Sequence, residues 1–313
     1  MAMLLGLQAD EELRQGLSPL AGGDANRVAV RTLALGGWKQ PQQLHLLAAL
    51  LVSGESPDLV INLDGLNEIF LSWAENHQRG VPEEFPRAWD ALAAGLTDSE
   101  GLERAGWVAF LSRSRRTVAE RIDRAPWRWS FSAGLVERAF QAVVGQKEHS
   151  ARQALSVVPI GKGPFPTESD QPTTVQESLR RSVELWGRAS EGMDAICRAA
   201  GCRYFHFLQP NLHDPLGKHL TAEEEALREA GGPVGPLVQA GYPMLVRRLA
   251  ALEESGVAAF DLTRAFSTQR SSLWVDTCCH VSAEGSKLLA AEIGKAIVAG
   301  TPRADVRTTG SSP

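Results

Sequence analysis

Short runs of β-branched and aromatic residues recur along the chain, each beside a longer segment whose apolar positions follow helical spacing. The run LVINL at 59–63 is bounded by Pro57 and Gly65 and is almost continuously apolar, as in a strand that is buried on both faces. Three further runs predict strands, at 27–33 (RVAVRTL), 203–208 (RYFHFL) and 257–262 (VAAFDL). The alternation predicts an α/β protein in which helices cover a mostly parallel sheet of at least four strands.

Apolar residues at helical spacing predict the helices that lie between these strands. The patterns cover five segments, at 6–17, 40–53, 175–200, 243–255 and 283–298. Thr221, followed three residues later by Glu224, forms a capping box and predicts the start of another short helix. Ser282 is the expected N-cap of the last helix.

The segment between Trp73 and Thr173 is rich in Trp, Arg and Ala and carries no strand signal. We interpret residues 74–173 as a helical insertion that ends in the Pro- and Gly-rich loop 159–172. The prediction is therefore one domain over residues 1–300, with this insertion inside it, followed by a disordered tail at 301–313.

Composition narrows the classes of partner. The chain has 313 residues, with 32 basic against 37 acidic side chains and a net charge of -5, and it has no basic stripe, so nucleic acid is not an expected partner. Its longest apolar run, 44–52, is interrupted by His45 and is far shorter than the roughly 20 residues of a membrane span. The N-terminus lacks the pattern of a secretory signal, so the chain as it stands is expected in the cytoplasm, and exported or membrane-anchored if an N-terminal extension precedes it.

The cysteines do not predict a metal site. There are four, at 197, 202, 278 and 279, and no two of them have C-x-x-C spacing. Adjacent Cys278 and Cys279 are poorly placed to direct both sulfurs at one zinc ion together with His280. We predict neither a metal nor another cofactor, and leave the redox state of the thiols open.

Polar residues follow each predicted strand, where parallel sheets bind their ligands. The four segments are 36–40 (GGWKQ), 64–68 (DGLNE), 209–211 (QPN) and 276–280 (DTCCH). Taken singly, each is ordinary turn chemistry. Of the other candidates, His206 lies within a strand and is interpreted as a core residue, whereas His213 and His219 are expected to be solvated in a loop.

Taken together and in order, a glycine pair, a G-x-N-E turn and a D-x-x-x-H segment before the last helix resemble the conserved blocks of the SGNH/GDSL hydrolases. The resemblance implies a three-layer α/β/α, flavodoxin-like fold and cleavage of esters through an acyl-serine. It implies that the backbone N–H of Gly37 and the side-chain amide of Asn67 form the oxyanion hole. By the same resemblance, His280 is the general base and Asp276 orients its ring.

The substrate side of the predicted site is less specific. Trp38, Glu68, Gln209 and Asn211 are the candidate substrate-binding residues, and turn or helix-start roles are equally open for them. The expected ligand is a small-molecule, carbohydrate or lipid ester. Its identity depends on the insertion, whose fold the sequence does not specify.

The chain departs from the family pattern in three ways. Asp276 and His280 are four residues apart where the family has three, and Glu68 stands where the family has aspartate. The third departure concerns the first block, a strand ending in a Gly-Asp-Ser or Gly-Gly-Ser motif that carries the nucleophile. Neither Ser18, in a turn, nor Ser53, at a helix end, follows a strand that could present it.

The missing strand would be central in such a sheet, so its absence leaves backbone groups of two neighbouring strands unpaired. The hypothesis is that a longer form of the chain carries this strand and its serine. Two alternatives stay open: a non-catalytic relative that binds a carbohydrate or lipid ester, and a flavodoxin-like module for a phosphate or nucleotide. The latter lacks a phosphate-binding loop of the G-x-G-x-x-G or P-loop type.

Overall fold

The computed structural model describes residues 7–77, 81–87, 99–126, 130–156 and 174–300. The chain divides into two compact units, Met1–Ala74 with Pro172–Pro313, and Glu75–Gln171. The first unit holds the sheet, and the described part of the second contains helices and no strand. The predicted loop at 159–172 and the tail at 301–313 lie outside the described residues.

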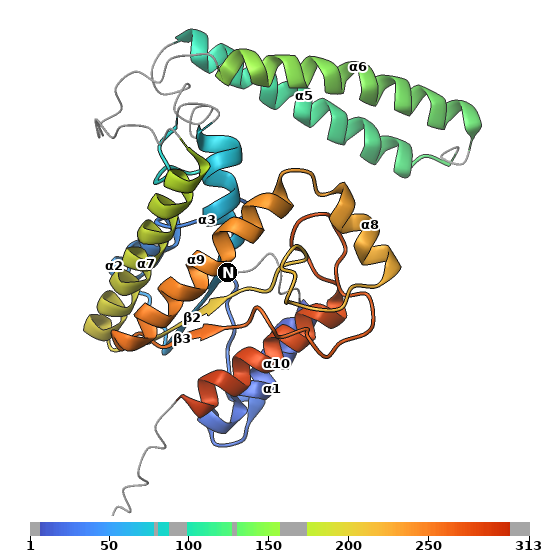
Figure 1. Ribbon diagram of the computed structural model, residues 1–313. Coiled ribbons are helices and arrows are strands. Elements are labelled where there is room, and N and C mark those ends of the chain that lie inside the picture. Colours follow the sequence, from blue (N-terminus) through green and yellow to red (C-terminus); the bar gives the residue numbers. More distant parts are fainter. Residues whose placement is uncertain (1–6, 78–80, 88–98, 127–129, 157–173, 301–313) are drawn as a thin grey trace, which may run out of the picture. The chain divides into compact units, whose positions relative to one another are not determined.

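Among its described residues, the first unit has a sheet of three parallel strands in the order β1-β2-β3, of which β2 and β3 are labelled in Figure 1. They are β1 (Leu59–Asp64), β2 (Arg203–Leu208) and β3 (Ala259–Asp261). In register, Leu59 lies beside Arg203, and His206 lies beside Ala259. The strands predicted at 59–63, 203–208 and 257–262 are therefore confirmed, the last one in a shorter form.

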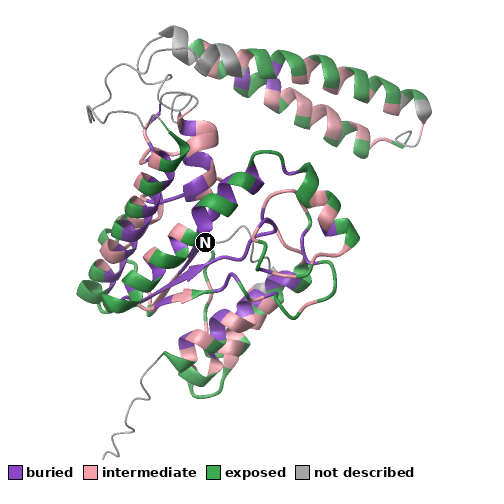
Figure 2. Cartoon of the chain, in the orientation of Figure 1, coloured by how far each residue is buried: buried purple, intermediate pink, exposed green. Residues whose placement is uncertain are grey.

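Side chains alternate between the two faces of the sheet, and helices cover both faces (Figures 1 and 2). On one face, Tyr204 and Leu208 pack with four helices: α2 (Gln42–Val52), α3 (Leu66–Leu71), α7 (Val175–Ala200) and α9 (Val234–Glu254). On the other, Leu63, Phe205 and Phe207 pack with α1 (Leu7–Leu17) and α10 (Ala283–Ala299). The described residues thus form a mixed α/β protein with nine α-helices and an all-parallel sheet, and α5 and α6 are the two helices that lie outside the unit that holds the sheet.

The predicted strand at 27–33 is wrong. Residues 25–27 form a short 3₁₀ turn, and the chain that follows has extended backbone at Val28 but joins none of the described strands. Val28 and Val30 still pack against the core that α1 and α10 share with the sheet. Residues 27–33 do alternate between apolar and polar positions, but a strand also needs a hydrogen-bonding neighbour. The described strands pair only with one another, β1 with β2 and β2 with β3.

The helix predicted to start at Pro243 starts at Val234 instead. Pro243 lies inside α9, whose buried face continues N-terminally through Leu237, Val238 and Tyr242. Burial of that face offsets the roughly 3 kcal/mol that an interior proline costs a helix. The predicted helices at 175–200 and 283–298 are confirmed, as are the caps at Thr221 and Ser282.

The second unit contains a pair of long helices, α5 (Ser99–Asp123) and α6 (Phe131–Ser156). Arg115 of α5 bonds to Glu148 and Gln141 of α6, which ties the two helices together. The described part of the segment predicted as a helical insertion contains no strand. No described helix anywhere in the chain is long and apolar enough to cross a bilayer.

Candidate functional site

The segment that carries Asp276 and His280 is a closed loop. Trp274 and Val281 form an isolated antiparallel bridge at its base, and Val275 N–H donates to the His280 carbonyl at 3.0 Å. The loop runs directly into α10, whose first turn is capped by Ser282. Both ends of the loop are therefore fixed by backbone hydrogen bonds.

Within this loop the Asp276 carboxylate holds both the backbone and the imidazole. Its Oδ1 accepts the N–H groups of Cys278, Cys279 and His280 at 3.0, 3.0 and 3.1 Å, and its Oδ2 hydrogen-bonds Nδ1 of His280. Burial raises the pKa of Asp276, but these bonds outweigh it and hold that pKa below its ordinary value. The four-residue spacing thus permits the pairing, because the chain folds back into a tight turn.

The ring orientation leaves one imidazole nitrogen available for chemistry. Since Nδ1 bonds to the carboxylate, the neutral ring carries its proton there and its Nε2 lone pair is the basic one. The His280 side chain is 43% exposed, so a substrate can reach it. Asp276 and His280 therefore have the geometry of a base and the group that orients it.

A buried ion pair holds the residues that lead into the loop. Glu224 of α8 (Ala222–Ala230) accepts the backbone N–H of Leu273 at 2.7 Å and that of Trp274 at 3.2 Å. Its second oxygen accepts from Lys218 Nζ and from the N–H of Thr221. Burial raises the pKa of Glu224, and the hydrogen bonds from Lys218 and these amides lower it below the ordinary value. The capping glutamate thus also anchors the candidate catalytic loop, a role that the sequence did not indicate.

The turn after β1 and the loop at 36–40 meet at the predicted oxyanion hole. Nδ2 of Asn67 donates to the carbonyl oxygen of Trp38 at 2.7 Å, which places the amide beside the residue that follows Gly37. Gly65 starts this turn at φ 137°, and a Cβ there would lie 2.5 Å from a Leu208 methyl carbon. Only glycine satisfies both conditions.

Glu68 also connects the turn after β1 to the loop at 36–40. One carboxylate oxygen accepts the N–H of Gln40 and the other the N–H of Gly65, each at 3.0 Å. Burial and the nearby Asp64 raise the pKa of Glu68 to about 8. The side chain is buried and engaged with backbone, so its position is that of a support for the turn.

The loop after β2 contacts the Asp276 loop through His213. Asn211 accepts the N–H of His213, and Nε2 of His213 bonds the carbonyl of Thr277 at 2.8 Å. His213 is only 3% exposed, so the expectation of a solvated ring is wrong. The reason is Gly231, where a Cβ would lie 2.4 Å from the His213 ring: the absence of a side chain makes room for the imidazole. His219 is exposed, as expected.

Tyr242 of α9 lies near both the turn after β1 and the Asp276 loop. Its hydroxyl oxygen would be 3.8 Å from a Cβ on Gly65, and it lies near Gln209 and Asn211, both buried. Burial and the neighbouring Cys279 raise the pKa of the Tyr242 phenol. Gln209 and Asn211 therefore lie near a side chain, that of Tyr242, which is close to both Gly65 and Cys279.

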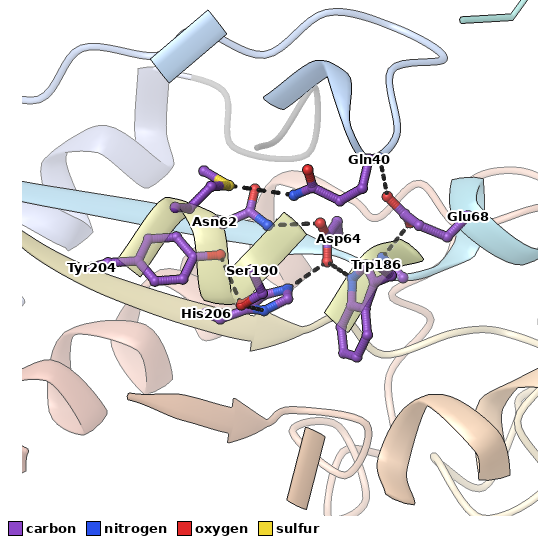
Figure 3. Close-up of polar contacts among 10 residues, drawn as sticks. Gln40, Asn62, Asp64, Glu68, Trp186, Ser190, Tyr204 and His206 are labelled. Atoms are coloured by element: carbon purple, nitrogen blue, oxygen red, sulfur yellow. Dashed lines mark hydrogen bonds and ion pairs between the residues drawn. The ribbon is translucent and has the colours of Figure 1, made fainter. Parts of the chain in front are cut away.

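A second set of Ser, His and Asp side chains lies beneath the turn, inside the core (Figure 3). Nε2 of His206 is 2.8 Å from Asp64 Oδ1, and its Nδ1 is 2.7 Å from Ser190 Oγ. Trp186 Nε1 and Asn62 Nδ2 also donate to the Asp64 carboxylate, each at 2.6 Å. Ser190 and His206 are fully buried, so these residues join α7 to the sheet; the interpretation of His206 as a core residue is confirmed.

Among the described residues, no three His, Cys, Asp or Glu side chains are grouped so as to hold a metal ion. Searches of protein-family models, curated proteins and solved structures found no match to the chain.

Proposed function

We propose that this chain is the body of a serine ester hydrolase of the SGNH/GDSL type, with the three-layer, flavodoxin-like α/β/α architecture of that family. The observation that carries the proposal is the Asp276–His280 pair, held in a closed loop before the last helix, with the His280 side chain 43% exposed. The Asn67 amide after β1 and the loop containing Gly37 supply the second half of the site. Helices on both faces of a parallel sheet support the fold assignment.

In the proposed reaction, Nε2 of His280 takes the proton of a serine hydroxyl as its oxygen attacks the ester carbonyl carbon. Negative charge develops on the carbonyl oxygen, where the second N–H of the Asn67 amide and the backbone N–H of Gly37 stabilise it. His280 then returns the proton to the departing alcohol, and water cleaves the acyl-serine by the same sequence. Asp276 stabilises the imidazolium that forms in each step.

The serine is proposed to arrive on an additional strand beside β1. Arg203 and Gln209 of the β2 segment donate to the carbonyls of Asp58 and Asp64, so the even-numbered residues of β1 face β2. The backbone groups of Leu59, Ile61 and Leu63 therefore point to the other side, which no described strand covers. A parallel strand there would end at the same edge as β1, near the turn that carries Asn67. It would also give residues 27–33 a neighbour, which none of the described strands provides.

The test uses a longer form of the protein, which includes the sequence encoded in frame upstream of Met1. We expect this extension to contain a strand that ends in a Gly-Asp-Ser or Gly-Gly-Ser motif. A fluorophosphonate should label that serine, and the protein should hydrolyse a short-chain aryl ester. His280→Ala should abolish turnover. The chain without the extension, treated in parallel, is the control and should react with neither reagent.

Other outcomes would select other functions. Retention of an acetylated sugar or a lipid ester without turnover would support the non-catalytic relative. Stabilisation by a nucleotide, with no labelling of any serine, would support a phosphate-binding module and contradict the hydrolase proposal.

A further inference from the structure

The segment between Asp276 and His280 contains two adjacent thiols in mutual contact. Cys278 Sγ lies 2.9 Å from Cys279 Sγ. Cys278 is half-buried, whereas Cys279 is 8% exposed. The backbone N–H groups of both cysteines donate to the Asp276 carboxylate, so the position of Asp276 depends on the backbone of these two residues.

We propose that Cys278 and Cys279 are a redox-sensitive pair, whose reversible oxidation to a vicinal disulfide rearranges the Asp276–His280 turn. The proposal concerns regulation, and its catalytic consequence rests on the proposed hydrolase function. The chemical modification itself depends only on the two thiols and their positions.

Geometry explains why such a bond would disturb the turn. A disulfide needs its sulfurs at about 2.05 Å, and its Cα atoms are usually 4.4–6.8 Å apart. Adjacent residues across a trans peptide have Cα atoms only about 3.8 Å apart. Because the planar peptide fixes that distance, Cys278 and Cys279 can be joined only through strained torsions in the side chains and on either side of this peptide, and the peptide carries the Cys279 N–H that now bonds to Asp276. A strained bond of this kind is also easily reduced, as a switch requires.

The oxidation balances with a peroxide as the named oxidant. The more exposed thiol, Cys278, takes one oxygen atom from hydrogen peroxide to give a sulfenic acid and releases water. The sulfur of Cys279 then attacks the oxidised sulfur, the S–S bond forms, and the hydroxyl leaves as a second water with the thiol proton of Cys279. A dithiol reductant restores both thiols by exchange.

The other two cysteines provide an internal comparison. Cys197, at the end of α7, and Cys202, just before β2, are 0% and 4% exposed. Burial and the neighbouring Cys202 raise the pKa of the Cys197 thiol, which disfavours the reactive thiolate. Peroxide should therefore act first at Cys278.

Trypsin separates the two pairs. Cleavage after Arg270 and Lys287 leaves Cys278 and Cys279 together in the peptide 271–287, while Cys197 and Cys202 fall in the separate peptides 189–198 and 199–203. After brief peroxide treatment and blocking of free thiols, peptide 271–287 should have lost two hydrogens and taken up no blocking group. Dithiothreitol should reverse the change. In Cys278→Ser and Cys279→Ser variants the loss should not occur.

The effect on the turn is read from the His280 ring by long-range proton–nitrogen NMR, which does not require activity. Its signals should shift on oxidation, return on reduction, and stay unchanged when peroxide is added to either serine variant. Gain of oxygen atoms at Cys278 without a disulfide, or a disulfide that leaves the His280 signals unchanged, would overturn the proposal. If the disulfide forms and the ring responds but no form hydrolyses esters, the switch stands and the hydrolase function fails.

Discussion

The side-chain amide of Asn67 donates one hydrogen to the carbonyl oxygen of Trp38 at 2.7 Å, across 29 positions of sequence. This bond fixes the plane of the amide, and with it the direction of the second N–H. The turn after β1 and the loop containing Gly37 are thereby held as one unit, with Glu68 as their second connection. The two donors of the predicted oxyanion hole come from two different loops, and the hydrogen bond from Asn67 to Trp38 holds these loops together.

Replacing Asn67 with alanine should have a small effect on stability and a large one on chemistry. Loss of the bond to Trp38 should lower the free energy of unfolding by about 1 kcal/mol, measured by urea titration. In the longer, serine-containing form, kcat should fall by about 10² to 10³-fold, with KM little changed. Asn67→Asp, which keeps the shape but loses the donor, should be equally slow. A variant that raised KM alone would place Asn67 in ground-state binding instead.

The fold could be predicted from sequence where local pattern and tertiary contacts agree. The helix at 175–200 has its cap at Thr174 and a buried stripe along its length, and LVINL is apolar because both of its faces are covered. The strand predicted at 27–33 shows the limit: alternation predicts extended backbone, but a strand also depends on a hydrogen-bonding partner, which is often distant in sequence and which the local pattern does not reveal. Pro243 is the opposite case, where packing overrides a strong local signal.

The candidate site divides in the same way. Asp276, His280 and Asn67 could be named as candidates because short motifs beside predicted strands and helices can be read from the sequence. The contacts that position them could not be found, since Glu224 reaches Leu273 across 49 positions and His213 fits only because Gly231 has no side chain. The pairing of Ser190 with His206 and Asp64 was also missed, because residues on a helix and two strands meet only in the folded core.

The buried Ser190–His206–Asp64 arrangement should prove structural. Ser190→Ala leaves Nδ1 of a buried imidazole without its partner and should lower the free energy of unfolding by about 1–3 kcal/mol. Ser182→Ala on the same helix is the matched control, because the Ser182 hydroxyl is buried and has no hydrogen-bond partner among the described residues; this change should be close to neutral. A fluorophosphonate should not label Ser190. Labelling there, abolished in Ser190→Ala, would show that this interior set reacts after all.

The ion pair of Glu224 with Lys218 should be essential for the Asp276 loop. Glu224→Gln leaves a buried ammonium without its carboxylate and should cost about 3–5 kcal/mol, detectable as a large drop in the urea midpoint. Backbone amides of Leu273 and Trp274 should then exchange faster with deuterium. Glu229→Gln, at an exposed position of the same helix, is the control and should change neither quantity. Unchanged exchange at Leu273 in Glu224→Gln would separate the ion pair from the loop.

Glu68 should make stability fall as pH rises through neutrality. Its pKa in the folded protein is about 8, against an ordinary value of 4.5, so between these values the folded state holds a proton that the unfolded state releases. The contribution is complete below the ordinary value and is lost as pH rises toward 8, at up to about 1.4 kcal/mol per pH unit. Glu68→Gln resembles the protonated acid and should remove this slope, whereas Glu254→Gln at the exposed end of α9 should keep it. Urea titrations at pH 5, 6, 7 and 8 would compare the three proteins. Parallel curves for the native chain and Glu68→Gln would mean that the carboxylate is ionised across the range and that the two amide donors outweigh its burial.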